Sequence, residues 1–265
     1  MPCEMTSNFA YWDEYWGELY RDNDETYPSI IYGFENVSTN VGRNQFVLPS
    51  IGACYGYICQ GAINVANKLL REGEYFCLGA GGTLYFDSDI PTRVVVSQRI
   101  GFRGVNMFGG PIEPKGRLKY IDTCSDTMLI APWKKGDPCL NHLHFPEGID
   151  QTSHIHPTTR SGIVARGKGA CITPDGEYPL FKGRLFWIPP DGDHRFQTLQ
   201  GSTMDVVPYH PDTDFGPEDE THPMVNMTWV DGTKIDNTTG RHAEAEVMNT
   251  KIDIGCPYGY GTKSD

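Results

Sequence analysis

Histidine is the residue type in this sequence best suited to chemistry, and its distribution is uneven. Five of the eight histidines fall within 53 residues: His142, His144, His154, His156 and His194. Neutral imidazole is a common ligand of transition metals. On an extended strand, residues two apart point to the same face, so His154 and His156 would present two rings side by side. The spacing predicts a bidentate metal site that needs one or two further ligands.

Turn-forming residues lie close to the histidines in both segments. The sequence PEGIDQTS (146–153) is a proline–glycine turn that leads into His154 and His156. Residues 183–194 read GRLFWIPPDGDH, in which a short apolar strand and a Pro-x-Gly turn precede His194. Strand, turn and histidine therefore follow in the same order twice.

This combination resembles the cupin superfamily. Its first motif has a proline–glycine turn, His-x-His, usually a glutamate, and a glycine-ended strand; residues 146–169 follow this order. Its second motif, a glycine, a strand, a Pro-x-Gly turn and a histidine, matches Gly183 through His194. The resemblance covers residues 140–210. It implies that His154, His156 and His194 hold one divalent transition metal, with Fe(II) favoured and Mn, Ni or Zn as alternatives.

Arg160 stands where the family motif usually has its glutamate ligand. A guanidinium cannot ligate a metal and is repelled by one. We therefore expect a centre of three neutral imidazoles with open coordination positions. An arginine beside such a centre is tolerable if an anion, such as a substrate carboxylate, lies between the two. A simple salt bridge of Arg160 is the alternative.

Other side chains are candidates for proton transfer near this centre. His142 and His144 precede the first turn and face either the same cavity or a structural environment. A general base could come from tyrosine or histidine. The candidates are Tyr178, Tyr209, His142 and His144, and we take Arg160, Tyr209 and His144 as the catalytic set. His210 and His222 lie in polar sequence and are expected to be solvated.

Turn formers are also frequent along the whole chain, which has 30 glycines and 19 prolines in 265 residues. Two series of short β-like segments, within 50–135 and 140–210, predict an all-β protein. The resemblance implies cupin double-stranded β-helix (jelly-roll) barrels, in a bicupin whose first barrel lacks metal, since residues 50–135 contain no histidine. The expected segments are an aromatic N-terminal arm (1–48), a degenerate barrel (49–135), a metal-binding barrel (136–232) and a C-terminal tail (233–265).

The N-terminal arm carries aromatic residues at helical spacing, which predicts one short helix. These residues are Tyr11, Trp12, Tyr15, Trp16, Leu19 and Tyr20. Residues 63–71 (INVANKLLR) fit a strand or a helix equally well. Between the last strands and the C-terminus, the acidic, proline-rich residues 210–224 are a candidate lid or exchanged arm.

Net charge and hydropathy limit the classes of partner that we expect for this protein. The formal net charge is −12, so a nucleic-acid backbone would be repelled. No apolar run is long enough to span a membrane, and the first residues do not form a secretory signal. We expect a cytoplasmic protein with eight reduced cysteines. We also expect a homodimer, because sheet edges need covering.

These observations favour a metal-dependent enzyme that acts on a small, anionic organic substrate. The three-histidine set resembles that of cupin dioxygenases, so a dioxygenase is the first hypothesis. A metal-dependent lyase or isomerase is the second, and a cupin that only binds a small molecule is the third. The sequence leaves the substrate, the metal and the choice among these reactions open.

Overall fold

The computed structural model describes residues 4–36, 44–218, 228–235 and 242–247. Within these ranges the chain forms strands and one short 3₁₀ turn, η1 (Ile121–Thr123), without an α-helix, which confirms the all-β class. The chain divides into a unit of residues 1–214 and a unit of residues 215–265. No helix in the described ranges could span a bilayer.

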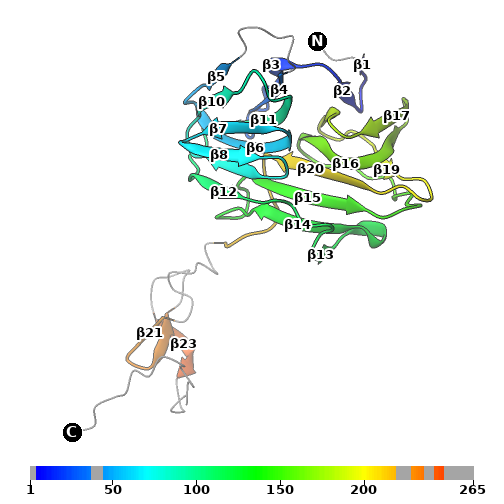
Figure 1. The fold of residues 1–265 in the computed structure, drawn as a ribbon. Coiled ribbons are helices and arrows are strands. Elements are labelled where there is room, and N and C mark those ends of the chain that lie inside the picture. The colour runs from blue at the N-terminus through cyan, green and yellow to red at the C-terminus, as the bar shows by residue number, and fades with distance from the viewer. Residues whose placement is uncertain (1–3, 37–43, 219–227, 236–241, 248–265) are drawn as a thin grey trace. The chain divides into compact units, whose positions relative to one another are not determined.

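The first half of the large unit is a pair of antiparallel sheets. A six-stranded sheet runs in the order β12-β9-β6-β11-β4-β3, and a four-stranded sheet in the order β5-β10-β7-β8 (Figure 1). Aromatic and branched side chains, among them Phe34, Phe76 and Leu84, fill the space between them. The strands are β3 (Trp16–Asp22), β4 (Ser29–Asn36), β5 (Gln45–Leu48), β6 (Gly52–Gln60), β7 (Ala62–Val65), β8 (Lys68–Arg71), β9 (Tyr75–Leu78), β10 (Gly82–Phe86), β11 (Thr92–Ile100) and β12 (Met107–Gly109).

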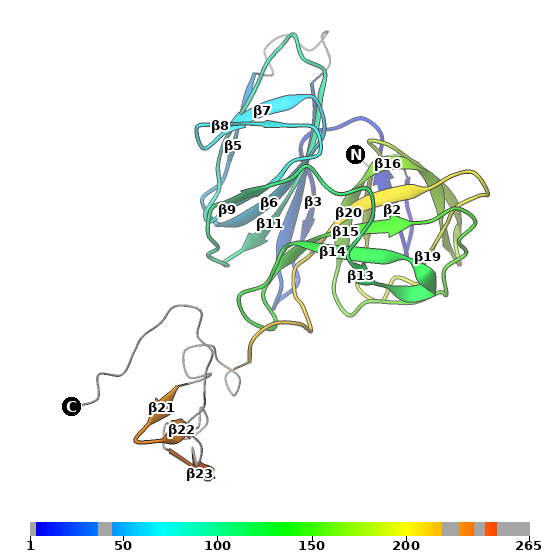
Figure 2. The same ribbon diagram turned by 60° about the horizontal axis from the view of Figure 1, so that its bottom comes forward.

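The second half is a ten-stranded arrangement with the main order β1-β2-β18-β16-β20-β15-β14-β13, to which β17 and β19 add by pairing with β16. It curls around its own core, which includes Phe145, Phe186 and Val206 (Figure 2). The strands are β1 (Glu4–Met5), β2 (Ala10–Trp12), β13 (Leu118–Lys119), β14 (Ser125–Ile130), β15 (Cys139–Phe145), β16 (Arg160–Thr173), β17 (Gly176–Phe181), β18 (Leu185–Ile188), β19 (Arg195–Gln197) and β20 (Met204–His210).

A third hydrophobic cluster joins the two halves. Tyr57 of β6 packs in it with Ile163 of β16 and Trp12 of β2. Buried hydrogen bonds cross the same interface: the Ser97 and Ser161 hydroxyls lie 2.9 Å apart. Strands β15 and β20 thus have two buried faces, one toward the second core and one toward the other half.

The aromatic N-terminal helix is a wrong prediction. Residues 10–12 form β2, which pairs with β18, and residues 16–22 form β3, which pairs with β4. Along β2, Ala10 and Trp12 are fully buried while Tyr11 is half-buried, the alternation of a strand. Aromatic residues suit strands well, and here the chain passes from one half to the other between Trp12 and Trp16. The arm is therefore part of both sheets.

The structure also shows the secondary structure of residues 62–71 and of the C-terminal unit. Residues 62–71 form the hairpin β7-β8, whose turn places Ala66 and Asn67 at positive φ (48° and 61°). In the small unit, β21 (Trp229–Val230), β22 (Thr233–Ile235) and β23 (His242–Val247) form a three-stranded sheet, so the expected tail contains strands. Residues 219–227 and 248–265, with His222 and residues 219–224 of the expected lid, lie outside the described residues.

Replacing Trp12 with alanine tests whether the shared cluster holds the two halves together. Trp12 is fully buried, whereas Trp133 is 66% exposed. We expect Trp12→Ala to lower the free energy of unfolding by about 3–5 kcal/mol. Trp133→Ala should change it by no more than about 0.5 kcal/mol. Urea unfolding followed by circular dichroism measures both, and equal effects of the two substitutions would contradict this role of the cluster.

Candidate metal centre

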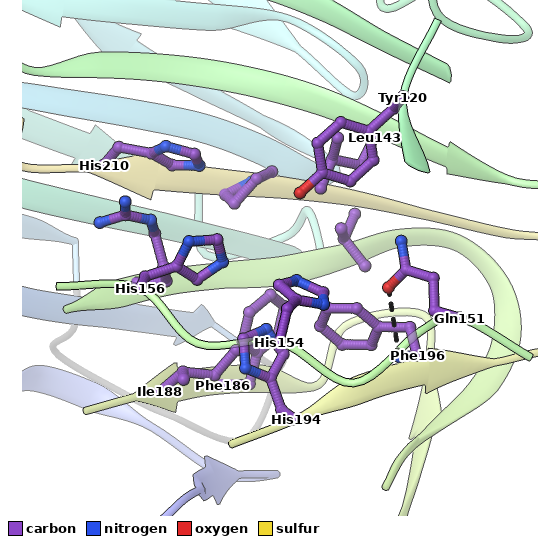
Figure 3. Close-up of a pocket in the computed structure, with 13 residues that line it drawn as sticks. Tyr120, Leu143, Gln151, His154, His156, Phe186, Ile188, His194, Phe196 and His210 are labelled. Atoms are coloured by element: carbon purple, nitrogen blue, oxygen red, sulfur yellow. Dashed lines mark hydrogen bonds between the residues drawn. The ribbon is translucent and has the colours of Figure 1, made fainter. Parts of the chain in front are cut away.

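Three histidines converge on one end of the second core (Figure 3). His154 and His156 lie in the connection between β15 and β16, and His194 lies just before β19. A pair of backbone hydrogen bonds joins the two segments: His154 N donates to His194 O (3.0 Å), and His194 N donates to His154 O (3.1 Å). The predicted strand at 153–157 is thus reduced to a single bridge, but this bridge brings the ligand segments together.

The side-chain geometry fits a shared metal ion. One nitrogen of each ring of His154, His156 and His194 lies within 4.8 Å of the other two. The ring centroids of His154 and His194 are 4.5 Å apart, and His156 is 5.2 Å and 5.3 Å from these two rings. The structure therefore brings together all three of the predicted ligands.

Backbone carbonyls orient two of the rings. His154 Nδ1 donates to Thr152 O, and His194 Nδ1 donates to Gly192 O, each at 2.9 Å. A carbonyl oxygen only accepts, so Nδ1 carries the proton in both rings and Nε2 keeps its lone pair. Metal-binding histidines characteristically have such a partner on the other nitrogen. The donor set thus fits a transition metal.

Burial keeps the imidazoles of His156 and His194 neutral. Loss of solvent lowers the pKa of His156 to about 3, and the nearby Arg160 charge acts in the same direction. Burial is also the main cause that lowers the pKa of His194 to about 4. Both rings are therefore unprotonated at neutral pH, which is the form that ligates a metal.

The histidines line a small cavity of about 20 Å³. This volume is close to what one water molecule needs. Apolar side chains of β15, β18, β19 and β20 form its inner wall, and polar groups gather near the histidines. The lining residues are Tyr120, Leu143, Gln151, His154, His156, Arg160, Phe186, Ile188, His194, Phe196, Val206, Pro208 and His210.

Arg160 begins β16, and its side chain is 9% exposed. Its hydrogen bonds to described residues all leave from Nη1, toward Thr158 O, Thr158 Oγ1, Thr159 O and Asp212 Oδ1. The Asp212 contact is long, at 3.4 Å. Nε is buried with no partner among the described residues. Within the described parts of the chain, neither Nε nor Nη2 of Arg160 has a hydrogen-bond acceptor.

Two lining residues were not predicted to face the site. His210 ends β20 with the same parity as Val206 and Pro208, so its ring points inward, 6.3 Å from that of His156. Its expected solvation is wrong: burial sets its pKa well below the usual value. Gln151, in the turn before His154, is buried and accepts a hydrogen bond from Phe196 N (3.3 Å). Extending the strand parity of 204–209 by one residue would have found His210.

Two residues of the predicted catalytic set, His144 and Tyr209, lie on the other face of the sheet. The parity of β15 and β20 turns both side chains toward the first half, away from the lining of the cavity. His144 Nδ1 contacts Asp205 Oδ1 (3.0 Å), as does His142 Nε2 (2.7 Å). The Tyr209 hydroxyl lies 3.3 Å from that of Ser29. These side chains therefore belong to the interface between the two halves.

The remaining basic and aromatic candidates are also engaged elsewhere. Arg166 forms an ion pair with Asp205, and Arg184 forms one with Asp13. Tyr178 packs in the second core against Phe9, with ring centroids 5.0 Å apart. Of these three arginines, Arg160 is the one that lines the cavity.

Comparisons with known proteins identify the fold. No family model matches the chain, and no curated protein matches it in sequence. Among solved structures, a cupin 2 conserved barrel domain protein from Leptotrichia buccalis is 14% identical, with 72% of this chain and 86% of that chain covered and a TM-score of 0.50. A glyoxylate-induced protein from Pseudomonas aeruginosa is 13% identical, with 80% and 83% covered and a TM-score of 0.53.

A third structure, protein Ylba from E. coli, is 13% identical, with 82% of this chain and 96% of that chain covered and a TM-score of 0.51. At identities this low, structural similarity indicates a shared fold and does not indicate a shared activity. The strand arrangement, the two motifs around the histidines and these structures agree. The chain has the fold of the cupin superfamily.

Proposed function

We propose that this protein is a metal-dependent enzyme that acts on a small organic acid, with Fe(II) held by His154, His156 and His194. The observation that carries the proposal is the buried Nε of Arg160, which has no partner among the described residues, in a cavity lined by three convergent imidazoles. Burial lowers the pKa of Arg160, but a guanidinium remains charged at neutral pH. A buried cation with an unpartnered edge is costly, and a carboxylate bound there would satisfy it.

The residues of the chain have separate roles in this proposal. The three histidines hold the metal, and the carbonyls of Thr152 and Gly192 fix the rings of His154 and His194. Arg160 orients the acid through two parallel hydrogen bonds. Leu143, Phe186 and Phe196 exclude water from the reacting groups. A bound Fe(II) ion would supply open positions at which an acid and dioxygen can meet, and we therefore favour a dioxygenase.

A lyase or isomerase reaction is the second candidate. Neutral nitrogen ligands leave the full charge on a divalent ion, which suits Lewis-acid chemistry with Zn, Ni or Mn as well. His210 favours this alternative, because its ring lies at the cavity wall, 6.3 Å from the ring of His156, where a group for proton transfer would be needed. A cupin that only binds a small acid would need no exchangeable metal, and we rank it third.

The proposal extends to the rest of the chain. We propose that the first half is a metal-free cupin barrel, which is consistent with its aromatic filling and with the absence of histidine from residues 50–135. The complete protein would then be a bicupin. A cytoplasmic homodimer remains our expectation from the sequence.

The metal ligands are tested by elemental analysis. We expect protein purified anaerobically to contain about one equivalent of iron, because three convergent imidazoles form one site. The double variant His154→Ala/His156→Ala should contain less than about a tenth of that amount. His144→Ala, which changes a histidine outside the cavity, is the control and should retain the metal. Equal metal content in the double variant and the wild type would contradict this ligand set.

The role of Arg160 is tested by the binding of glycolate to cobalt-loaded protein in a calorimeter. Arg160→Met should weaken glycolate binding about 10- to 100-fold, the worth of charge-assisted hydrogen bonds, with the cobalt content unchanged. Arg160→Lys should recover only part of the affinity, because lysine cannot bind a carboxylate through two parallel bonds. Arg166→Met is the matched control. Loss of cobalt from folded Arg160→Met would instead assign Arg160 a structural role at the metal site.

A further inference from the structure

The hydroxyl of Tyr120 points into the cavity from the wall opposite the three histidines (Figure 3). It makes no hydrogen bond with any residue in the described ranges, and Tyr120 is half-buried. Burial raises the pKa of Tyr120, with a smaller contribution from Asp126, so the phenol keeps its proton. A protonated hydroxyl without a partner, directed at the site, is a donor available to a ligand.

The turn that carries Tyr120 is locally strained. Asp122 and Thr123 of η1 have left-handed backbone conformations, with φ of 53° and 67°. This region is uncommon for non-glycine residues, and for β-branched threonine it is an outlier. The hydrogen bond from Tyr120 N to Cys124 O (2.9 Å) closes the turn. Such conformations persist where the surroundings impose them, often beside a binding site.

The segment that carries His154 holds this turn in place. Thr152 N donates to Asp122 Oδ2 (2.6 Å), while Thr152 O accepts from His154 Nδ1 (2.9 Å). Gln151 Nε2 also lies 3.8 Å from Cys124 Sγ. Thr152 thus links the position of Tyr120 to the orientation of His154, so the phenol and the imidazole are fixed relative to each other.

The small size of the cavity gives the phenol of Tyr120 a second role, which is to limit the size of a ligand. About 20 Å³ of free space leaves room for roughly one water molecule beside the histidines. We expect a two-carbon acid to need only a small outward movement of the wall, and an aromatic acid to need displacement of the phenol of Tyr120. Leu143 and Phe196 lie in strands of the sheet, so they yield less readily than a residue on a turn.

We propose that Tyr120 selects short-chain acids, with two or three carbons, and donates a hydrogen bond to the acid once it is bound. The inference rests on the proposed function, since it takes Arg160 as the anchor of the carboxylate. It adds to that function the chemical class of the substrate. It also adds a residue that contacts the substrate, Tyr120, which lies in a turn outside both sequence motifs. Tyr120 acts as the boundary of the site, and Asp122 is the residue that positions it.

Binding of two probes to cobalt-loaded protein tests both roles of Tyr120. Glycolate represents a short acid and salicylate an aromatic one, and the visible absorption of cobalt reports their binding without turnover. We expect the wild type to bind glycolate at least about 10-fold more tightly than salicylate. Tyr120→Ala should reduce this preference about 10-fold or more, because the wall is removed. Tyr120→Phe should keep the preference and weaken glycolate binding about five-fold, the worth of one hydrogen bond.

Controls separate these effects from misfolding. Tyr85→Phe removes a hydroxyl from a half-exposed tyrosine of β10 and should leave both affinities unchanged. Asp122→Ala should weaken glycolate binding like Tyr120→Phe, and Asp122→Asn, which keeps an acceptor, should restore it. Tyr120→Leu provides a second smaller side chain if the alanine variant does not bind cobalt.

Two outcomes would overturn the inference in distinguishable ways. An unchanged preference in cobalt-loaded Tyr120→Ala or Tyr120→Leu, with glycolate still bound, would refute the selection by Tyr120 and leave the proposed function standing. Failure of the cobalt-loaded wild type to bind either acid would refute the proposed substrate class, and the role of Tyr120 with it.

Discussion

The backbone bridge between His154 and His194 is the contact on which the candidate site depends. Its two hydrogen bonds join the connection that precedes β16 to the turn that precedes β19. These segments are forty residues apart in sequence, and the strands β15, β16 and β18 must be in register before they can meet. The sheet that contains these strands therefore delivers three rings to one point, although the histidines themselves lie in connecting segments.

Charge and burial together explain why the site is suited to an acid. The imidazoles of His156 and His194 are neutral because burial lowers their pKa, and Arg160 brings a positive charge close to His156. Asp212 offsets that charge only in part, through a contact of 3.4 Å. Asp205 in contrast neutralises Arg166 on the opposite face of the sheet, where His142 and His144 also contact it. On one face of the sheet, Asp205 therefore pairs with Arg166. On the other face, the charge of Arg160 is only partly offset by a carboxylate.

Local patterns in the sequence predicted the convergence of the three histidines better than the surroundings of the site. His154, His156 and His194 were found because motif spacing and turn residues fix short-range geometry. His144 and Tyr209 were misassigned because both faces of β15 and β20 are buried, so hydrophobicity does not reveal which face borders the cavity. Tyr120 and Gln151 reach the site through turns whose tertiary contacts no periodicity encodes. The helix predicted from the spacing of Trp12 and Trp16 failed because strands of two sheets share these aromatic residues.

Anomalous X-ray scattering from a crystal of the cobalt- or iron-loaded protein tests the central claim most directly. The account predicts one strong peak between the rings of His154, His156 and His194. It further predicts ligation through Nε2 of His154 and His194, because their Nδ1 protons are held by Thr152 O and Gly192 O. A metal bound elsewhere, for example at the His142–His144–Asp205 cluster, or ligation through Nδ1 of these two rings, would contradict it.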